Sequence, residues 1–467
     1  DQPRSRGLGD VYKRQGDILY GSVDGGQRWT DITAKASGTA IQWTGATLSG
    51  SDNIVFQVTD LAGNTGAQIG TSAYVLDTTA PTLTVSGVGL SNDTGSSSSD
   101  LITNVAGQTI YATLSAGLSS GDQLYGSVDG GTTWTDITAK AIGTAISWDG
   151  AILSGSNTIA FKVVDLAGNT GNTTGMTGYV LDTTTPALTV GGVSLSDDTG
   201  TSSSDLITNL ADQTISATLS ADLIAGDSLY GSVDGGTSWQ EITDKVSNQA
   251  ILWDDVTLSG SNSIVFKVTD LAGNTGSLTG TSPYVLDQAA PTLTVSGVSL
   301  SVDSGSSSSD LVTNVASQTI RGTLSGSLSA GDRLYGSLDG GITWTDITSK
   351  ASATAITWDG ATLWGQNSVV FKVTDLAGNT GSETGWSSYV LDQVAPAQTV
   401  SDVILSVDTG SSASDLITNT APQTISATLS AALASGESLF GSLDGGSSWT
   451  NINTCLLYTS PSPRDRG

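Results

Sequence analysis

The sequence has no histidine, one cysteine and one methionine, and only 16 lysines and arginines against 44 aspartates and glutamates. Without histidine there is no Ser-His-Asp triad, no imidazole base and no histidine-containing zinc site, which excludes most enzyme mechanisms. The formal net charge of −28 argues against binding nucleic acid or anionic membranes, because both are bound through clustered lysine and arginine. No run of 18 apolar residues occurs, so we expect no membrane span in this sequence.

The acidity that is present comes almost entirely from aspartate, since only Glu241, Glu383 and Glu437 are glutamates. Aspartate is a poor helix former, but it accepts hydrogen bonds well in turns and in oxygen-ligand metal loops. Abundant Gly, Ser and Thr between short apolar runs favour many short strands. The composition therefore predicts an all-β protein whose natural counter-ion is Ca²⁺.

The two ends differ in composition from everything between them. Residues 5–15 read SRGLGDVYKRQ and residues 455–465 read CLLYTSPSPRD, and both resemble translated transposase-type sequencing-adapter sequence. We therefore expect residues 1–15 and 455–467 to be artefactual. Without them, residues 16–454 hold 10 basic and 41 acidic residues and no cysteine. On this interpretation the chain is an internal piece of a larger protein, and a missing secretion signal carries no information.

Internal repetition determines the architecture. The motif GS(V/L)DGG begins at Gly21, Gly126, Gly231, Gly336 and Gly441, always 105 residues further on. This spacing predicts three whole repeats and two partial ones. The whole repeats are 78–182, 183–287 and 288–392, and the partial ones are 16–77, a C-terminal part, and 393–454, an N-terminal part. A period near 105 residues is too long for a propeller blade or solenoid coil, but it fits one immunoglobulin-like β-sandwich.

Alternating apolar residues and turn signals predict about seven strands in each repeat. In repeat 78–182 we expect them at 82–90, 108–115 and 123–128, then around Trp134 and Ile137, around Ile146 and Trp148, at 159–163, and around Tyr179. A proline at position 81, and its counterparts at 186, 291 and 396, precede the first strand, where no ladder hydrogen bond is needed. The predicted array is elongated, with one core per repeat.

The segment SVDGGTTW at 127–134 fits the Asp-box pattern known from sialidases. A sialidase would also need an arginine cluster and a tyrosine nucleophile, and repeat 78–182 contains no arginine. The segment is therefore interpreted as a β-hairpin in which Asp129 accepts turn amides, Gly130 and Gly131 adopt positive φ, and Trp134 caps the core.

Two further loops recur in every repeat. We call 93–104 and its counterparts the DTG loop, because it reads DTGSSSSDLITN, and we call 165–171 and its counterparts the DLAGN loop. Taken alone, the first would be a flexible connection between the first two strands, and the second an ordinary hairpin loop with Asx turns. The DTG loop lacks the aspartate spacing and glutamate of an EF-hand.

The topology of a seven-stranded sandwich places the DTG loop at the C-terminal pole of one repeat and the DLAGN loop at the N-terminal pole of the next. Carboxylates that converge without lysine or arginine repel one another, and Ca²⁺ with six to eight oxygen ligands relieves this repulsion. We therefore predict Ca²⁺ at the junctions. The candidate ligands are Asp93, Asp100, Asp182, Asp227, Asp270 and Asn274 at the first junction, and Asp198, Asp205, Asp287, Asp332, Asp375 and Asn379 at the second.

LDTTAP, DTGSSSSDLITN and VxDLAGNTG together resemble the bacterial immunoglobulin-like repeats of very large surface adhesins exported by type I secretion, including the extender regions of repeats-in-toxin adhesins. The resemblance extends over residues 16–454. It implies an extracellular or secreted rod at the bacterial surface, connected with cell adhesion and biofilms, in which Ca²⁺ at the domain junctions limits bending. It also implies that Asp182, Asp287 and the aspartates of the two loops are ligands.

Three functions follow from these observations. The first is a non-enzymatic spacer whose partners are its own neighbouring repeats and which projects a distal binding domain; any ligand of the parent protein is then a cell-surface or glycan ligand bound elsewhere. The alternative is that the repeats themselves bind a glycan or host surface, for which Trp364 and Trp386, each present in one repeat only, are candidates. A hydrolase would rest on the Asp-box alone, and a motif without a site does not make an enzyme.

Overall fold

The structure, a computed structural model, describes residues 16–456. Within this range all regular structure is β-strand apart from 3-10 turns of three residues each. The prediction of an all-β protein is therefore confirmed. The expectation that the ends are adapter sequence falls almost wholly on residues 1–15 and 457–467, which lie outside the described residues.

By its internal contacts the chain divides into two compact units. The first holds the described residues up to Gly192 together with Ala217–Ile251 and Ile264–Thr281. The second holds Val193–Ser216, Leu252–Ser263 and the described residues from Ser282 onward. The predicted boundaries between repeats stay predictions, and the units are described separately below.

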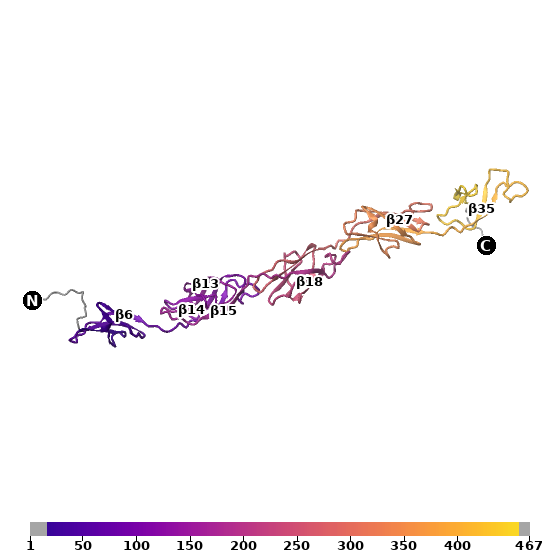
Figure 1. Ribbon diagram of the computed structural model, residues 1–467. Helices are drawn as coiled ribbons and strands as arrows, with labels where there is room; N and C mark the ends of the chain where they lie inside the picture. The colour runs from indigo at the N-terminus through magenta and orange to yellow at the C-terminus, as the bar shows by residue number, and fades with distance from the viewer. Residues whose placement is uncertain (1–15, 457–467) are drawn as a thin grey trace, which may run out of the picture. The chain divides into compact units, whose positions relative to one another are not determined.

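Repeat 78–182, in the first unit, forms a sandwich of two sheets (Figure 1). One sheet has four strands in the order β12-β13-β9-β7, and the other has five in the order β11-β10-β14-β15-β8. The elements are β7 (Val85–Leu90), β8 (Ile102–Thr103), β9 (Gly107–Leu114), β10 (Gln123–Ser127), β11 (Thr135–Asp136), the 3-10 turn η2 (Thr138–Lys140), β12 (Ala141–Ile142), β13 (Ala145–Ile152), β14 (Ser156–Val164) and β15 (Thr174–Leu181).

The DTG loop of this repeat is more ordered than the sequence suggests. Its last residues form β8, which pairs in parallel with β15 through Ile102 opposite Val180 and Thr103 opposite Leu181. The hydrogen bond from the amide of Asp182 to the carbonyl of Thr103, at 3.0 Å, extends this pairing to the end of the repeat. The end of this loop is therefore part of the five-stranded sheet, which the sequence does not reveal, because two residues of strand are too short to leave a periodic signal.

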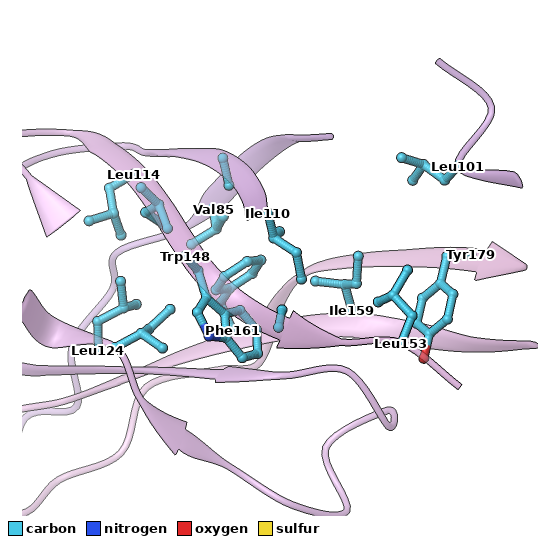
Figure 2. Close-up of a cluster of buried hydrophobic side chains, with 14 of the residues drawn as sticks. Val85, Leu101, Ile110, Leu114, Leu124, Trp148, Leu153, Ile159, Phe161 and Tyr179 are labelled. Atoms are coloured by element: carbon cyan, nitrogen blue, oxygen red, sulfur yellow. The ribbon is translucent and has the colours of Figure 1, made fainter. Parts of the chain in front are cut away.

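The core of repeat 78–182 lies between the two sheets, where alternate residues of β9, β13 and β14 point inward (Figure 2). Ile110, Ile159 and Phe161 are completely buried. The rings of Trp148 and Phe161 meet edge to face at a centroid distance of 6.4 Å, a geometry that aromatic pairs prefer. Trp134, by contrast, is only half-buried and is not part of this core, so the prediction that it caps the core is wrong.

Lys162 explains the position of Trp134, because its ammonium group lies 4.3 Å from the centroid of the indole ring. Such a cation–π contact holds an aromatic ring on the outer face of a sheet. The same pair recurs as Lys267 with Trp239, at 4.2 Å, and as Lys372 with Trp344, at 4.1 Å.

The other two whole repeats have the same element order. In repeat 183–287 the elements are β16 (Val190–Leu195), β17 (Ile207–Thr208), β18 (Asp212–Leu219), β19 (Ser228–Ser232), β20 (Gln240–Glu241), η3 (Thr243–Lys245), β21 (Val246–Ser247), β22 (Ala250–Thr257), β23 (Ser261–Thr269) and β24 (Thr279–Leu286). In repeat 288–392 they are β25 (Val295–Leu300), β26 (Val312–Thr313), β27 (Ser317–Leu324), β28 (Arg333–Ser337), β29 (Thr345–Asp346), η4 (Thr348–Lys350), β30 (Ala351–Ser352), β31 (Ala355–Thr362), β32 (Gln366–Thr374) and β33 (Thr384–Leu391).

The partial repeats contain the strands expected of fragments. Residues 16–77 form β1 (Ile18–Ser22), β2 (Thr30–Asp31), η1 (Thr33–Lys35), β3 (Ala36–Ser37), β4 (Ala40–Ile41), β5 (Ser51–Thr59) and β6 (Ile69–Val75). Residues 393–454 and the adjoining Cys455 form β34 (Val400–Leu405), β35 (Ile425–Leu429), β36 (Phe440–Gly441), β37 (Thr450–Asn451) and η5 (Asn453–Cys455). Because each lacks part of a sandwich, residues that are buried elsewhere are open here. Ile425, for example, is 47% exposed, whereas its counterpart Ile110 is 0% exposed.

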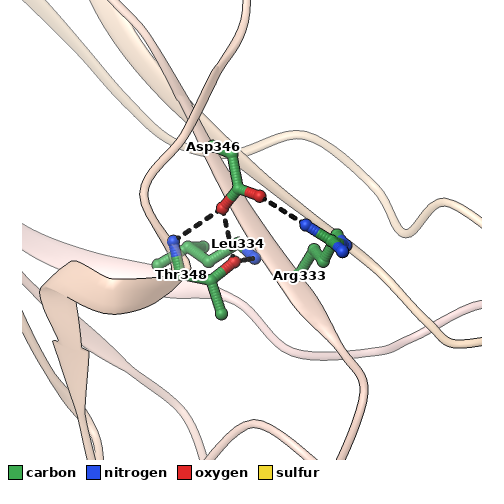
Figure 3. Close-up of polar contacts among 4 residues, drawn as sticks. All are labelled: Arg333, Leu334, Asp346 and Thr348. Atoms are coloured by element: carbon green, nitrogen blue, oxygen red, sulfur yellow. Dashed lines mark hydrogen bonds and ion pairs between the residues drawn. The ribbon is translucent and has the colours of Figure 1, made fainter. Parts of the chain in front are cut away.

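A short polar network fastens the 3-10 turn of each whole repeat to its neighbouring strand, and Figure 3 shows it in repeat 288–392. The carboxylate of Asp346 accepts hydrogen bonds from the amide and hydroxyl of Thr348, at 3.0 and 2.7 Å, and an ion pair from Arg333, at 2.8 Å. The Thr348 hydroxyl in turn accepts the amide of Leu334 at 3.0 Å. Thr348 therefore links the turn to β28, while the exposed Arg333 pair adds little.

Replacing Phe161 by alanine tests whether repeat 78–182 has a core of its own. We expect a loss of about 3–5 kcal/mol, because a large cavity opens beside Trp148. The loss should appear as faster amide hydrogen exchange in peptides from 78–182, measured by mass spectrometry on the full chain. Peptides from 288–392 should be unchanged, because that repeat has a separate core around Phe371. Ile142→Ala is the control, since Ile142 is 83% exposed, and equal loss in both repeats would contradict separate cores.

Candidate functional site: the junction between repeats

The Asp-box hairpin is held by its own side chains. The carboxylate of Asp129 accepts the amide of Thr133 at 2.8 Å, the hydroxyl of Thr133 at 2.5 Å and the hydroxyl of Ser127 at 2.7 Å. Gly130 and Gly131 have φ of 69° and 91°, as predicted. All three of these bonds come from within the hairpin, so the Asp129 carboxylate stabilises the turn.

The DLAGN loop closes on its first aspartate in a similar way. In repeat 183–287 the amide of Asn274 donates to Asp270 Oδ1 at 2.8 Å, and its side-chain amide donates to Asp270 Oδ2 at 2.9 Å. The amide of Asp270 donates back to the carbonyl of Asn274 at 3.0 Å. The Asx turn expected from the sequence is therefore present, and it presents the carbonyls of Leu271 and Ala272 outward.

The DTG loop is built around Asp93. Its Oδ2 accepts the amide of Leu101 at 3.0 Å, which holds Leu101 at a φ of 61°. A left-handed leucine costs of order 1–3 kcal/mol. The loop offsets this cost because the Leu101 side chain is buried and its carbonyl accepts the amide of Val180 at 3.0 Å. The same strained position recurs at Leu206, Leu311 and Leu416.

The other oxygen of Asp93, Oδ1, is buried and has no hydrogen-bond partner. The same atom is without a partner in Asp198, Asp303 and Asp408. A buried carboxylate oxygen that accepts nothing loses its hydration without compensation. Burial accordingly raises the pKa of Asp93, and the neighbouring carboxylate of Asp100 raises it further, against the lowering effect of the Leu101 amide. Burial and Asp205 raise the pKa of Asp198 in the same way.

In the first unit, the DTG loop of repeat 78–182 meets the DLAGN loop of repeat 183–287. The hydroxyl of Thr94 donates to the carbonyl of Ala272 at 2.6 Å, and the side-chain amide of Asn274 donates to the carbonyl of Asp182 at 2.8 Å. Gly95 lies so close that a Cβ atom there would overlap the carbonyl oxygen of Leu271. Backbone packs directly on backbone at this junction, which only glycine permits.

The second unit repeats this geometry between 183–287 and 288–392. Thr199 donates to the carbonyl of Ala377 at 2.6 Å, and Asn379 donates to the carbonyl of Asp287 at 2.8 Å. A Cβ on Gly200 would overlap the carbonyl oxygen of Leu376. The junction is therefore a property of the two loop sequences and recurs wherever both are present.

Where a repeat has no neighbouring DTG or DLAGN loop to meet, its own loop is exposed to solvent. Repeat 78–182 follows a partial repeat without a DTG loop, and its Ala167 is exposed, whereas Ala272 and Ala377 are 2% and 1% exposed. Gly305, in the DTG loop of repeat 288–392, has open space where a Cβ would lie. Asn169 still donates to the carbonyl of Asp77, at 3.0 Å, so the linker contact survives without the loop contact.

The predicted calcium ligands fall into two groups rather than one. In the first group, burial and then the charge of Asp100 raise the pKa of Asp93 within the DTG loop. In the second group, the pKa of Asp227 at the junction is raised, first by burial and then by the charges of Asp270 and Asp182. The side-chain nitrogen of Asn274 donates to the carbonyl of Asp182 at 2.8 Å and to Asp270 Oδ2 at 2.9 Å, which joins the linker to the DLAGN loop directly. From residue 16 to residue 456, no three acidic, histidine or cysteine side chains gather closely enough to hold a metal by themselves.

The second junction has the same local arrangement. Asp375 is 8% exposed and accepts both nitrogens of Asn379, at 2.8 and 2.9 Å, and the carbonyl of Asp287 accepts the Asn379 side chain. Asp332 caps its own turn by accepting the amide of Ser329 at 2.9 Å. Asp205 accepts the amide of Ile207 at 3.2 Å.

Sequence reasoning concentrated on the acidic residues and did not single out Thr94, Gly95, Leu271 and Ala272. A signal was present, because a glycine follows the DTG threonine and a small Leu-Ala-Gly sequence recurs in every DLAGN loop. Loops rich in glycine and alanine also occur for purely local reasons, so this signal alone does not identify an interface.

Comparison with known proteins gives the following. Residues 79–183 and 289–393 match the family of bacterial Ig-like domains. No curated protein matches the chain. A structure of Sidekick-1 immunoglobulin domains 1–4 aligns at 8% identity over 80% of this chain and 90% of its own, with a TM-score of 0.20. Sidekick-1 immunoglobulin domains 1–5 align at 8% identity over 83% and 74%, with a TM-score of 0.19. None of the helical turns in the described part of the chain is long and apolar enough to cross a membrane.

The hydrogen bonds of the Asp-box hairpin predict how Asp129 titrates and how its contribution to stability changes at low pH. Hydrogen bonds from the hydroxyl and amide of Thr133 and from Ser127 lower the pKa of Asp129 to about 2. Because the folded-state pKa is depressed, the stabilisation is complete above the ordinary pKa of 3.8 and is lost as the pH falls towards 2. Thr133→Val should therefore move the titration of Asp129 up towards 3.8, as followed by carboxyl ¹³C NMR, with Asp129→Asn identifying the signal.

Thr132→Val is the matched control for this titration. The Thr132 hydroxyl donates to the backbone carbonyl of Asp129, not to its carboxylate, so the pKa should stay close to 2. Equal shifts in the two variants would show that the hydroxyl of Thr133 does not stabilise the ionised form.

Proposed function

Because the chain carries tandem bacterial Ig-like repeats, we propose that it is a structural extender of a large, type I-secreted bacterial surface adhesin and is not an enzyme. The observation that carries this proposal is the repeated junction: the same two loops meet in the same way in each of the two units. An extender needs modules that fold separately and join in a fixed manner, because its function is to hold a distal domain at a distance from the cell surface. Such a segment works outside the cell and holds a distal binding domain away from the surface.

Each whole repeat supplies what an extender module requires. The sandwich closes on its own residues, and the connection to the next sandwich is short: eight residues separate Leu181 at the end of β15 from Val190 at the start of β16. Pro186 lies inside this linker and restricts its backbone. A short, restricted linker supports transmission of orientation from one repeat to the next.

We further propose that Ca²⁺ binds in the DTG loop. The donor chemistry fits a hard cation: Asp93 and Asp100 are neighbouring carboxylates, and Asp93 Oδ1 is buried with no partner. The orphaned oxygen also occurs in Asp303 and Asp408, whose loops meet no DLAGN loop, so this site would belong to each loop by itself. When bound, the ion supplies the positive charge that the pair lacks; backbone carbonyls or water complete its ligands.

A second Ca²⁺ position is proposed at the junction beside Asp227, whose carboxylate is repelled by Asp182 and Asp270. Because these three carboxylates do not lie closely enough to hold the ion by themselves, backbone carbonyls or water would complete its ligands. The mutual repulsion of the carboxylates and the burial of Asp227 disfavour three negative charges in this place. A cation would reverse this effect and would join the linker to two loops at the near pole of the following repeat, since Asp227 and Asp270 flank the paired residues Ser228 and Thr269. The corresponding residues at the second junction are Asp287, Asp332 and Asp375.

Binding of a glycan or surface ligand by the repeats themselves is the second candidate function. Trp364 and Trp386 are 59% and 55% exposed, which suits stacking against a sugar ring. Both occur in one repeat only, however, and isolated exposed apolar residues are common on protein surfaces. The extender therefore explains more of the chain.

Calcium should raise the melting temperature of the full chain and increase its maximum dimension in solution scattering, relative to chelator. Ligand binding to the folded state adds about 2.7 kcal/mol when the free ion is about one hundred times above its Kd. Magnesium at equal ionic strength is the control, because Mg²⁺ requires near-octahedral geometry and gives up its water ligands less readily than Ca²⁺. Identical melting and scattering in calcium and chelator would contradict the calcium proposal.

A triple variant, Asp93→Asn, Asp198→Asn and Asp303→Asn, tests the position of the ion. Because the folded pKa of Asp93 and of Asp198 is raised, the ionised form costs stability at neutral pH, and an uncharged asparagine removes this cost. We expect the variant to melt higher than the wild type in chelator and to gain less from calcium. Asp222→Asn, at an exposed aspartate outside both loops, should change neither property.

A further inference from the structure

Every DTG loop is closed by the same hydrogen bond from its leucine amide to its first aspartate, and every DLAGN loop by the same bond from its asparagine amide to its aspartate. We infer that the DTG loop is a socket for the DLAGN loop of the following repeat, and that this direct interlock, without any metal, fixes the angle between repeats. The proposed partner of each socket is a repeat that carries Leu-Ala-Gly at the tip of its DLAGN loop. The inference rests on the extender function for its purpose, but its geometry stands by itself.

The first argument is the fit of backbone to backbone. Gly95 approaches Leu271 so closely that no side chain fits, and Gly273 approaches Gly95 in return, since a Cβ on Gly273 would lie 2.9 Å from the amide nitrogen of Gly95. Contact of this kind depends on the angle between the two repeats, because a small rotation separates or overlaps main-chain atoms that cannot adapt. A socket lined by flexible side chains would tolerate such a rotation.

The second argument is the hydrogen bond that closes the interlock. The oxygen of Thr94 accepts the amide of Asn104 at 2.9 Å. Three acceptors lie within reach of its hydroxyl, and the carbonyl of Ala272 at 2.6 Å is closer than Asn104 Oδ1 at 3.1 Å and Thr103 Oγ1 at 3.3 Å. Thr94 is thus positioned by its own loop before it meets the next repeat. Ser304 in repeat 288–392 likewise accepts the amide of Asn314 at 2.9 Å, and its hydroxyl donates to Asn314 Oδ1 at 3.0 Å. The loop therefore holds this hydroxyl in place in a copy that meets no following DLAGN loop.

The third argument is the comparison between occupied and open copies. Ala272 and Ala377 are buried where a socket precedes them, whereas Ala62 and Ala167 are exposed where none does. The change in exposure follows the presence of the socket and not the sequence of the loop, which is the same in all four. The DLAGN loop is therefore complementary to the socket and to nothing within its own repeat.

The fourth argument concerns how tightly the DTG loop must bind the DLAGN loop. The interlock is small, but the linker from Asp182 to Thr189 keeps its two halves together, and a short tether corresponds to a millimolar effective concentration. A contact too weak to join separate molecules then suffices to order neighbours along one chain. The interlock also has a direction, because the socket and the DLAGN loop lie at opposite poles of a repeat.

The experiment compares Ala272→Leu with Ala167→Leu in the full chain. Spin labels are attached to Ile142→Cys and Leu252→Cys, two exposed positions on neighbouring repeats, in a Cys455→Ser background. Distances are measured by pulsed electron spin resonance in chelator, so that no divalent ion takes part. We expect a narrow distribution for the wild type, a broad one for Ala272→Leu, and an unchanged one for Ala167→Leu, whose side chain meets no socket.

A second pair of variants examines the socket side. Gly95→Ala and Gly305→Ala impose the same left-handed strain, at φ of 95° and 101°, but only the first also meets the next repeat. Hydrogen exchange of each DTG loop measures the strain, and the Gly305→Ala value serves as the reference. Gly95→Ala should broaden the distance distribution, whereas Gly305→Ala should leave it unchanged.

The outcomes separate the proposals. A narrow wild-type distribution that Ala272→Leu and Gly95→Ala do not broaden would overturn the interlock and leave the extender intact. A distribution that is broad in chelator and narrow in calcium would also overturn the interlock, in favour of calcium as the stiffening agent. A distribution that is broad in both conditions would contradict both the interlock and a stiff extender.

Discussion

The shortage of positive charge is the constraint on which the rest of the structure depends. Nearly every aspartate must be stabilised without lysine or arginine, and the stabilisation comes from hydrogen bonds that amides and hydroxyls of the chain donate to the carboxylates. Asp129 is held by Thr133 and Ser127, Asp136 by Thr138, and Asp165 by Asn169, and in each case these hydrogen bonds lower the pKa of the carboxyl group. The aspartates therefore fix turns, which is why so acidic a chain still forms tight loops between short strands.

Asp93 is the exception that connects this constraint with function. One oxygen orders the DTG loop through Leu101, and the other is buried without a partner. The loop thus combines a strained leucine, an uncompensated carboxylate and the threonine that meets the next repeat. A cation at Asp93 would stabilise the same loop that forms the socket, so calcium binding and the interlock would reinforce each other without sharing an atom.

Much of the fold could be predicted because its signals are periodic. Alternation along 145–152 and 156–164 is long enough to mark β13 and β14, and the inward positions Trp148, Ile159 and Phe161 follow from it. The prediction was wrong where the signal was short or ambiguous. Trp134 has the apolar character of a core residue, and its contact with Lys162 cannot be read from spacing, because Trp134 precedes β11 whereas Lys162 lies in β14, far along the sequence. The parallel pairing of β8 with β15 joins segments almost a whole repeat apart.

At the junction, charge counting located the right loops but not the atoms that join them. Aspartates are conspicuous in a sequence, whereas the contacts between repeats are made by a threonine hydroxyl, an asparagine side-chain amide, the backbone carbonyls that accept from them, and the absence of a side chain at glycine. The same contacts form in both units although neighbouring residues differ: the linker begins with Asp182 and Thr183 in one and with Asp287 and Gln288 in the other. Local sequence in the two loops is therefore sufficient to specify the junction. A chain that repeats those loops every 105 residues repeats the same joint, and a substitution at a glycine of the socket would affect orientation before it affected the cores.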